Sequence, residues 1–199
     1  STPEHDAQRR DFTINGLFFD PIAEQVIDFV GGQDDLAARR LRAIGDPEAR
    51  IDEDKLRMLR AVRFAATYEL QIDPATLNAV QRHADELQLV SAERIAEEMR
   101  RMLRHSQRAR AVEILRDSGL LTVVLPEFEP VAGDASRWQQ SLEILAAMGE
   151  NGTFPAALAV LLRRVDEGGP RYQRAIDVAG RWRLANEERD RSKLLLRHE

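Results

Sequence analysis

Residues 53–63 read EDKLRMLRAVR, an acidic pair followed by arginines at three-residue spacing. On a helix, each step of three residues advances about 300° around the axis. The apolar residues between the charges gather mostly on the other side, as in an amphipathic helix that packs on a core. The charged residues form a slanting stripe, which consists of Asp54, Arg57, Arg60 and Arg63.

A stripe of this kind suits a nucleoside triphosphate. The carboxylate can accept a hydrogen bond from a base amino group, one guanidinium can donate to the ring, and further guanidinium groups can hold phosphates. A solvated helix face with ion pairs three residues apart is the commoner reason for an arginine-rich helix. The choice between the two interpretations depends on a second motif upstream.

Composition limits the classes of protein to consider. The 199-residue chain is 43% hydrophobic, enough for a core and for one or two domains, and its net charge of −5 leaves only local basic clusters for nucleic-acid contacts. We find no apolar run of membrane-span length and no signal-peptide pattern. The chain has no cysteine, which excludes disulfides and thiolate metal sites and fits a reducing cytoplasm. We expect a cytoplasmic protein without a membrane contact; the sequence does not indicate its oligomeric state.

The N-terminal residues predict a small α/β region. Residues 10–19 are typical of a short helix or turn, residues 26–30 of a strand, residues 34–40 of a short helix and residues 41–44 of a second strand.

From residue 47 onward the pattern is helical, so the fold class is mainly α. The arginine-rich segment predicts one helix from Asp52, its expected N-cap, to about residue 68. The further expected helices cover residues 74–87, 92–105, 109–118, 137–148, 155–165, 172–182 and 186–197.

The second motif lies at residues 9–15, which read RRDFTIN. Arg9 and Arg10 offer phosphate donors, and Asp11 and Asn15 offer acceptors for ribose hydroxyls within a few residues. Surface arginines with an aspartate cap would explain this string by itself. They do not explain its occurrence about 40 residues before the arginine stripe.

The two motifs together resemble the class II tRNA nucleotidyltransferase and bacterial poly(A) polymerase family, whose members add CCA or adenylate to RNA 3′ ends. RRDFTIN is similar to the ribose-binding motif of that family, and EDKLR at residues 53–57 to its base-selecting motif. DFVGG at residues 28–32 resembles its hinge, and SAERIAEE at residues 91–98 resembles the helix-stabilising motif of its neck. The likeness is strong over residues 6–104.

The resemblance implies an architecture of three parts. Residues 1–46 would be the C-terminal remnant of a polymerase-β-like nucleotidyltransferase head. Residues 47–125 would form a helical neck that selects the base and binds RNA, and residues 126–199 a helical body.

The resemblance also implies roles for single residues. Arg10 would contact the triphosphate and Asp11 the ribose, and Asn15 would belong to the same nucleotide-binding set. Asp54 and Arg57 would present a template to the base edge, because cytosine and adenine both pair an amino donor with a ring acceptor. Arg60 and Arg63 would face the phosphates. The supporting residues would be Arg9, Asp28 and Glu53, of which Glu53 would orient Arg57.

One departure from the family pattern concerns activity. The Gly-Gly-x-x-Arg-Asp turn and Asp-x-Asp strand that hold metal in this family are absent from the sequence. Asp52 and Asp54 spell Asp-x-Asp, but at a helix start their side chains diverge by about 200°. We therefore expect no catalytic residue and no metal ligand in this chain, which would be catalytically incomplete, with Mg²⁺ bound in a full-length parent.

A basic cluster follows the helix-stabilising motif. It consists of Arg100, Arg101, Arg104 and Arg108, and it could follow an RNA backbone. Glu97 and Glu98 lie one turn earlier, so a salt-bridged surface is an equally good account.

The hypothesis that unites these observations is CCA addition to tRNA from CTP and ATP. Its partners would be the two triphosphates and a tRNA or other RNA 3′ end. CCA addition is favoured because residues 91–98 are more similar to CCA-adding relatives. The alternatives are a poly(A) polymerase of the same family and a non-catalytic helical RNA- or protein-binding module.

Overall fold

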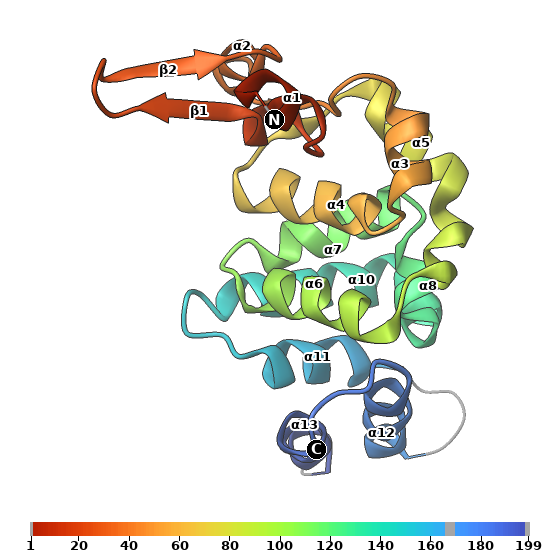
Figure 1. Ribbon diagram of the computed structural model, residues 1–199. Helices are drawn as coiled ribbons and strands as arrows, with labels where there is room; N and C mark the ends of the chain where they lie inside the picture. The colour runs from red at the N-terminus through yellow and green to blue at the C-terminus, as the bar shows by residue number, and fades with distance from the viewer. Residues whose placement is uncertain (1, 166–169, 198–199) are drawn as a thin grey trace.

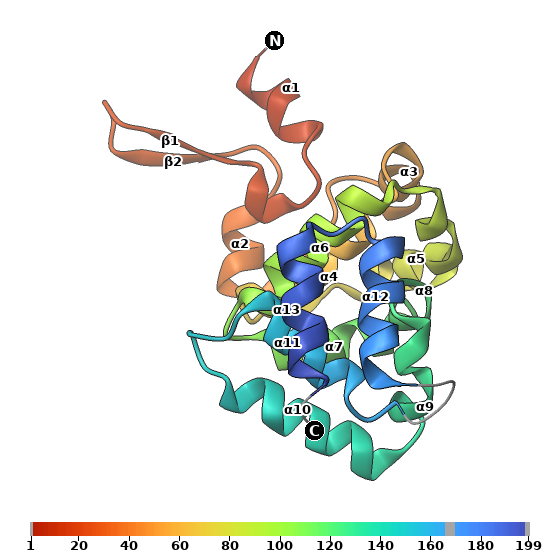
Figure 2. The same cartoon turned by 90° about the horizontal axis from the view of Figure 1, so that it is seen from below.

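A small α/β unit sits on a stack of helices. The computed structural model describes residues 2–165 and 170–197, with the chain passing from the α/β unit through successive helical layers to α12 and α13 (Figure 1). In the rotated view the β1–β2 hairpin projects away from the helices (Figure 2). No helix in the described ranges is both long and apolar enough to cross a membrane.

The α/β unit has more strand than the sequence predicts. It contains α1 (Pro3–Gln8), the 3₁₀ turn η1 (Thr13–Asn15), β1 (Leu17–Asp20), β2 (Gln25–Asp28), α2 (Gly32–Ala37) and β3 (Arg40–Leu41). The prediction of a helix or turn over residues 10–19 is wrong for its second half, because β1 lies there and pairs antiparallel with β2. β3 pairs in parallel with β4 (Gln71–Ile72). Two residues are too few to show strand alternation, so β4 had no sequence signal.

The hinge-like segment holds the RRDFTIN segment closely. The Asp28 carboxylate accepts hydrogen bonds from the amides of Val30, Gly31 and Gln33, which caps the turn into α2. Burial alone would raise the pKa of Asp28, but these amide bonds outweigh burial and lower it. A Cβ at Gly32 would lie 2.3 Å from the Thr13 carbonyl oxygen, so this approach requires glycine.

The arginine-rich segment forms two helices, and the prediction of one is wrong. α3 (Pro47–Glu53) ends at Asp54, whose backbone is extended (φ −155°, ψ 103°), and α4 (Arg57–Thr67) begins three residues later. Asp52 therefore lies inside α3 and caps nothing. The residues at the break have ordinary helix propensities and include no proline or glycine, so the sequence carries no signal for it.

The remaining helices build one hydrophobic core. In order they are α5 (Pro74–His83), η2 (Ala84–Leu89), α6 (Ala92–Arg104), α7 (Arg108–Asp117), α8 (Leu121–Val124), η3 (Pro126–Phe128), α9 (Glu129–Ala132), α10 (Ala135–Ala147), α11 (Phe154–Leu162), α12 (Arg171–Arg181) and α13 (Asn186–Leu195). The apolar side of α4 packs against α6 and α7. Because the buried cluster runs from Phe12 to Leu196, it crosses residues 46 and 125, and the three-part division stays a prediction.

Arg108 does not belong to an RNA-binding surface, which corrects the sequence-based assignment. Its side chain is fully buried. The guanidinium donates to four backbone carbonyls, those of Leu103, Arg104, Leu145 and Gly149. Arg108 therefore joins the α6–α7 corner to the end of α10, and its donors are used inside the protein.

We expect Arg108→Ala to lower the free energy of unfolding by at least about 3 kcal/mol, because it leaves several buried carbonyl groups without donors. Chemical denaturation followed by circular dichroism measures the change. The exposed Arg104→Ala is the matched control and should stay within about 0.5 kcal/mol of the unmodified chain. Equal losses in the two variants would contradict the structural role of Arg108.

Candidate nucleotide-binding site

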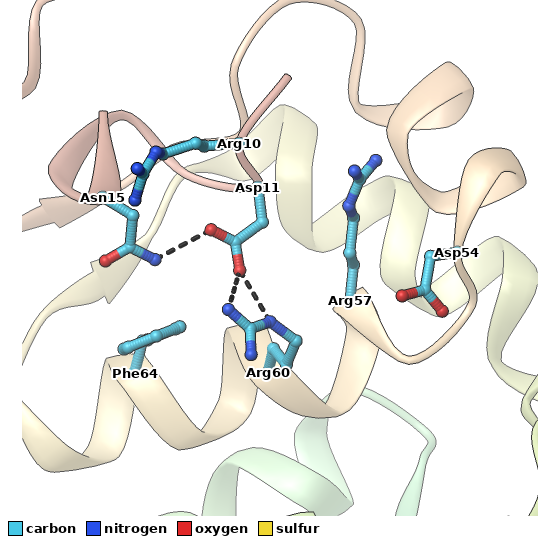
Figure 3. Close-up of a pocket in the computed structure, with 7 residues that line it drawn as sticks. All are labelled: Arg10, Asp11, Asn15, Asp54, Arg57, Arg60 and Phe64. Carbon is cyan, nitrogen blue, oxygen red and sulfur yellow. Dashed lines mark hydrogen bonds and ion pairs between the residues drawn. The ribbon is translucent and has the colours of Figure 1, made fainter. Parts of the chain in front are cut away.

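A pocket of about 490 Å³ lies between the α/β unit and α4 (Figure 3). Six of its seven lining residues come from the two motifs at residues 9–15 and 53–63. The lining set is Arg10, Asp11, Asn15, Asp54, Arg57, Arg60 and Phe64. The fold therefore brings together the two segments that the sequence separates by about 40 residues.

Asp11 connects the two walls of this pocket. Its buried carboxylate receives Arg60 from α4, with Asp11 Oδ2 at 2.7 Å from Nε and 2.6 Å from a terminal nitrogen. Asp11 Oδ1 accepts from the Asn15 side-chain amide at 2.8 Å and from the Phe12 backbone amide at 2.9 Å. These bonds fix the η1 turn against α4.

Arg57 is held by the end of α3. Glu53 accepts from Arg57 at 2.5 Å, and the Arg50 carbonyl accepts from the same nitrogen at 2.7 Å. Hydrogen bonds from Arg57 and then from Arg50 lower the pKa of Glu53, so this carboxylate is ionised at neutral pH. The Glu53–Arg57 contact that the sequence predicts is present in the structure.

Asp54 is an ionised acceptor at the opposite end of the pocket from Phe64 (Figure 3). Burial alone would raise its pKa, but hydrogen bonds from Arg94 and from the Leu56 amide outweigh burial and lower it. Arg94 donates to Oδ2 at 2.8 Å and the Leu56 amide donates to Oδ1 at 3.1 Å. Since the α3–α4 break lies at Asp54, the carboxylate stands beside the Arg57 side chain at the pocket wall.

Arg63 does not line the pocket, which corrects the assignment of this residue to phosphates. Its Nε lies 2.6 Å from Glu98 of α6, and its guanidinium carbon lies 4.1 Å from the centre of the Phe64 ring. The stripe drifts by about 60° at each three-residue step, which turns its last member toward α6. Phe64 lines the pocket where Arg63 was expected. It follows Arg57 by seven residues, or about two helical turns, so the two residues share a helix face, and this spacing could have identified Phe64 from the sequence.

The paired arginines of the first motif differ from each other. Arg10 lines the pocket, donates to Asp6 at 2.8 Å and lies over the Phe18 ring at 5.5 Å. Arg9 is exposed, donates to the same carboxylate and does not line the pocket. Hydrogen bonds from Arg10 and then Arg9 lower the pKa of Asp6.

The expected basic cluster is divided. Arg100 forms ion pairs with Glu97 and with Glu188 of α13, and Arg101 pairs with Glu97, so the salt-bridged account describes both residues. Arg104 is exposed and forms no side-chain hydrogen bond or ion pair within residues 2–165 and 170–197. RNA binding by Arg100, Arg101 and Arg104 stays a prediction.

Asp52 and Asp54 do not form a two-metal site. Asp54 pairs with Arg94, and Asp52 pairs with Lys55 at 2.5 Å. Asp52, His83 and Glu86 place ligand atoms within 4.8 Å of one another. However, Lys55 already lies 2.6 Å from Glu86 and supplies the positive charge at this cluster. Asp52 and Asp54 therefore do not supply the paired carboxylates that two-metal phosphoryl transfer requires.

His83 lies between two carboxylates. Its Nδ1 is 2.7 Å from Glu86 and its Nε2 is 2.5 Å from Glu48. Glu86 and then Glu48 raise the pKa of His83. The stabilisation from this charged histidine is complete below its unfolded pKa of about 6.5 and is lost as the pH rises through the higher pKa of the folded state.

We therefore expect the stability of the chain to decrease as the pH rises above about 6.5, and His83→Gln to remove part of that decrease. Thermal melts between pH 5.5 and 8.5 measure the effect. His5→Gln, at the exposed α1, is the control and should leave the pH dependence unchanged. If His83→Gln and the unmodified chain show the same pH dependence, the ion pairs of His83 do not contribute to folding.

Comparisons with known proteins agree with this geometry. Residues 1–42 match a family model described as the poly A polymerase head domain. Residues 69–131 match a model described as a probable RNA and SrmB-binding site of polymerase A.

Individual relatives include poly(A) polymerases and CCA-adding enzymes. Poly(A) polymerase I of Salmonella typhi is 42% identical over 123 residues, which cover 62% of this chain and 26% of that protein. The CCA-adding enzyme of Lactobacillus helveticus is 34% identical over 175 residues, covering 86% of this chain and 42% of the relative. The crystal structure of Bacillus stearothermophilus CCA-adding enzyme with CTP matches with a TM-score of 0.69 and 29% identity, over 98% of this chain and 46% of that one.

The fold and the pocket define a helical neck and body joined to part of a nucleotidyltransferase head. The chain belongs to the family of bacterial poly(A) polymerases and tRNA CCA-adding enzymes. It spans between about a quarter and less than half of the length of the relatives described above. The predicted family and the mainly α fold class are confirmed.

Proposed function

We propose that this chain is the nucleotide-selecting part of an RNA 3′-terminal nucleotidyltransferase that adds CCA to tRNA from CTP and ATP. The observation that carries the proposal is the pocket, which places the Asp54 and Arg57 pair at one end and Arg10, Asp11 and Asn15 on the facing wall. Asp54 and Arg57 would bind the base, Asp11 and Asn15 the ribose, and Arg10 the phosphates.

Base selection follows from the charge states at the α3–α4 break. The ionised Asp54 carboxylate can only accept hydrogen bonds, and the Arg57 guanidinium can only donate them. Cytosine and adenine present an amino donor beside a ring-nitrogen acceptor and so match the pair. Uracil and guanine would place a carbonyl oxygen against the carboxylate. A matched bidentate pair contributes about 1–3 kcal/mol of discrimination in other nucleic-acid recognition.

The other wall would bind the sugar and the phosphates. The Asn15 amide, oriented by Asp11, offers a carbonyl oxygen to a ribose hydroxyl. Arg10 supplies a guanidinium to the triphosphate, with Arg60 beside it in the pocket. Mg²⁺ belongs to the proposed activity of the complete protein, where it would stabilise charge on the phosphates. The described carboxylates do not match its site, so the proposal assigns no catalytic step to them.

Polyadenylation is the second candidate, favoured by the 42% identity to poly(A) polymerase I. Both activities would use the same base-reading pair, because adenine satisfies it. The complete protein should be incubated with tRNA that lacks its CCA end and with each triphosphate alone. Incorporation of both C and A supports CCA addition, whereas incorporation of A without C overturns it. A cytoplasmic location belongs to the same proposal.

We expect Arg57→Ala to weaken CTP and ATP binding by about 5- to 150-fold, the equivalent of losing one bidentate contact. Isothermal titration calorimetry of the 199-residue chain with CTP, ATP, UTP and GTP measures the selectivity. Arg101→Ala is the matched control, because Arg101 lies on α6 and does not line the pocket.

The same variants separate the enzyme proposal from a binding module without chemistry. RNA affinity should be unchanged in Arg57→Ala, because Arg57 faces the base of the nucleotide. If the unmodified chain binds RNA but shows no preference for CTP and ATP over UTP and GTP, the base-reading role of Asp54 and Arg57 is wrong.

A further inference from the structure

An exposed tyrosine continues the nucleotide pocket beyond the end of α4. Tyr68 follows α4 directly and is 57% exposed, whereas Phe64 is nearly buried. The two rings stack with their centroids 5.9 Å apart and their planes 11° from parallel. Because Phe64 lines the pocket, the Tyr68 ring extends the same helix face by one turn past the pocket rim.

The ring beneath Tyr68 is held rigidly. Phe12 packs edge-on against Phe64 at 5.8 Å, and Arg63 lies over the Phe64 ring at 4.1 Å. Arg63 is fixed in turn by its ion pair with Glu98. Tyr68 therefore stands on a preorganised base, with over half of its surface open to solvent.

Two unpaired cations lie on chain corners that meet this end of α4. Arg39 and Arg104 are exposed, and neither side chain forms a hydrogen bond or ion pair within the part of the chain that the structure describes. The Arg39 carbonyl accepts from the Gln71 amide at 2.8 Å, which places the α2–β3 corner beside the segment that follows Tyr68. Gln107 donates to Glu69 at 3.0 Å, which places the α6–α7 corner on the same end of α4.

The free charge of these two arginines distinguishes them from their neighbours. Arg40 and Arg42 form ion pairs with Asp35, and Arg100 and Arg101 form ion pairs with Glu97. Glu69, the carboxylate nearest to Tyr68 in the sequence, is held by Gln107. An exposed aromatic ring with unpaired guanidinium groups on the adjoining corners is a combination that can bind single-stranded nucleic acid, because bases stack on the ring and phosphates pair with the cations.

We propose that Tyr68, seated on Phe64, is a stacking platform for the last bases of a single-stranded RNA 3′ end, whose phosphates would pair with Arg39 and Arg104 on the adjoining corners. Seven residues separate Arg57 from Phe64, or about 10 Å along the helix axis. Tyr68 lies four residues further on, about 16 Å from Arg57 along the axis, so a 3′-terminal base on its ring would lie just beyond the Phe64 end of the pocket. The inference rests on the proposed function and adds to it the place where the RNA substrate ends. A tyrosine that only shields Phe64 is the competing explanation.

The first experiment measures stacking at the RNA terminus. A 12-nucleotide RNA carrying 2-aminopurine as its last base is titrated with the 199-residue chain, and anisotropy and fluorescence quenching are recorded. We expect Tyr68→Ala to weaken binding by about 5- to 100-fold and to abolish the quenching. Tyr68→Phe keeps the ring and should stay within about twofold of the unmodified chain. Moving 2-aminopurine six nucleotides inward should give no Tyr68-dependent quenching.

Controls separate stacking from stability. Tyr172→Ala removes the other tyrosine of the chain, on α12, and should leave RNA affinity unchanged. If Tyr68→Ala lowers the melting temperature but retains the affinity and the terminal quenching, Tyr68 only shields Phe64 and the proposal is wrong. Absence of RNA binding by the unmodified chain would overturn it equally.

The second experiment tests the cations by salt dependence. Arg39→Gln and Arg104→Gln should each weaken binding and reduce the slope of log affinity against log salt by about 0.7, the value for one phosphate contact on a single strand. Arg191→Gln, an exposed arginine on α13, is the matched control. Unchanged slopes in both variants would exclude phosphate contacts. Selective CTP and ATP binding is measured separately, so it can hold while the platform fails, or fail while the platform holds.

Discussion

The ion pair between Asp11 and Arg60 is the interaction on which the site depends. It joins a turn near the N-terminus to the middle of α4, 49 residues later, and buries the carboxylate at the junction. A buried carboxylate without its partner would be costly, so the two segments are held in one relative position. The walls of the nucleotide pocket are these same two segments, and their separation is set by this contact.

The distribution of paired charge explains how an acidic chain can present a cationic pocket. Most of the basic side chains described above are engaged: Arg108 by backbone carbonyls, Arg63 by Glu98, Arg100 by Glu188. Because such arginines are neutralised or buried, their number in the sequence says little about where an anion binds. The three arginines of the pocket are also ion-paired, Arg10 with Asp6, Arg57 with Glu53 and Arg60 with Asp11, but they converge on one cavity.

Sequence patterns predicted the family, the helical class and most of the pocket lining. They failed where several segments had to be placed together. The division of α3 from α4 at Asp54 has no local signal, and it decides which way the Asp54 carboxylate points. Arg63 and Arg108 carry guanidinium groups that could bind an anion. In the structure, however, Arg63 pairs with Glu98 of α6 and Arg108 donates to the Leu145 carbonyl of α10. Phe64 and Tyr68 were overlooked because apolar residues in a helix usually indicate core.

The sequence by itself determined which chemical groups are available: the RRDFTIN string, the EDKLR string and their order along the chain. Those are covalent facts, and motif chemistry follows from them. Only the tertiary structure decided which of the groups face a common cavity, because helix rotation and long-range ion pairs set the direction of each side chain. The carboxylate of Asp54 and the guanidinium of Arg57 stand together at one end because α3 stops there. The Phe64 ring closes the other end, since α4 carries it to the rim.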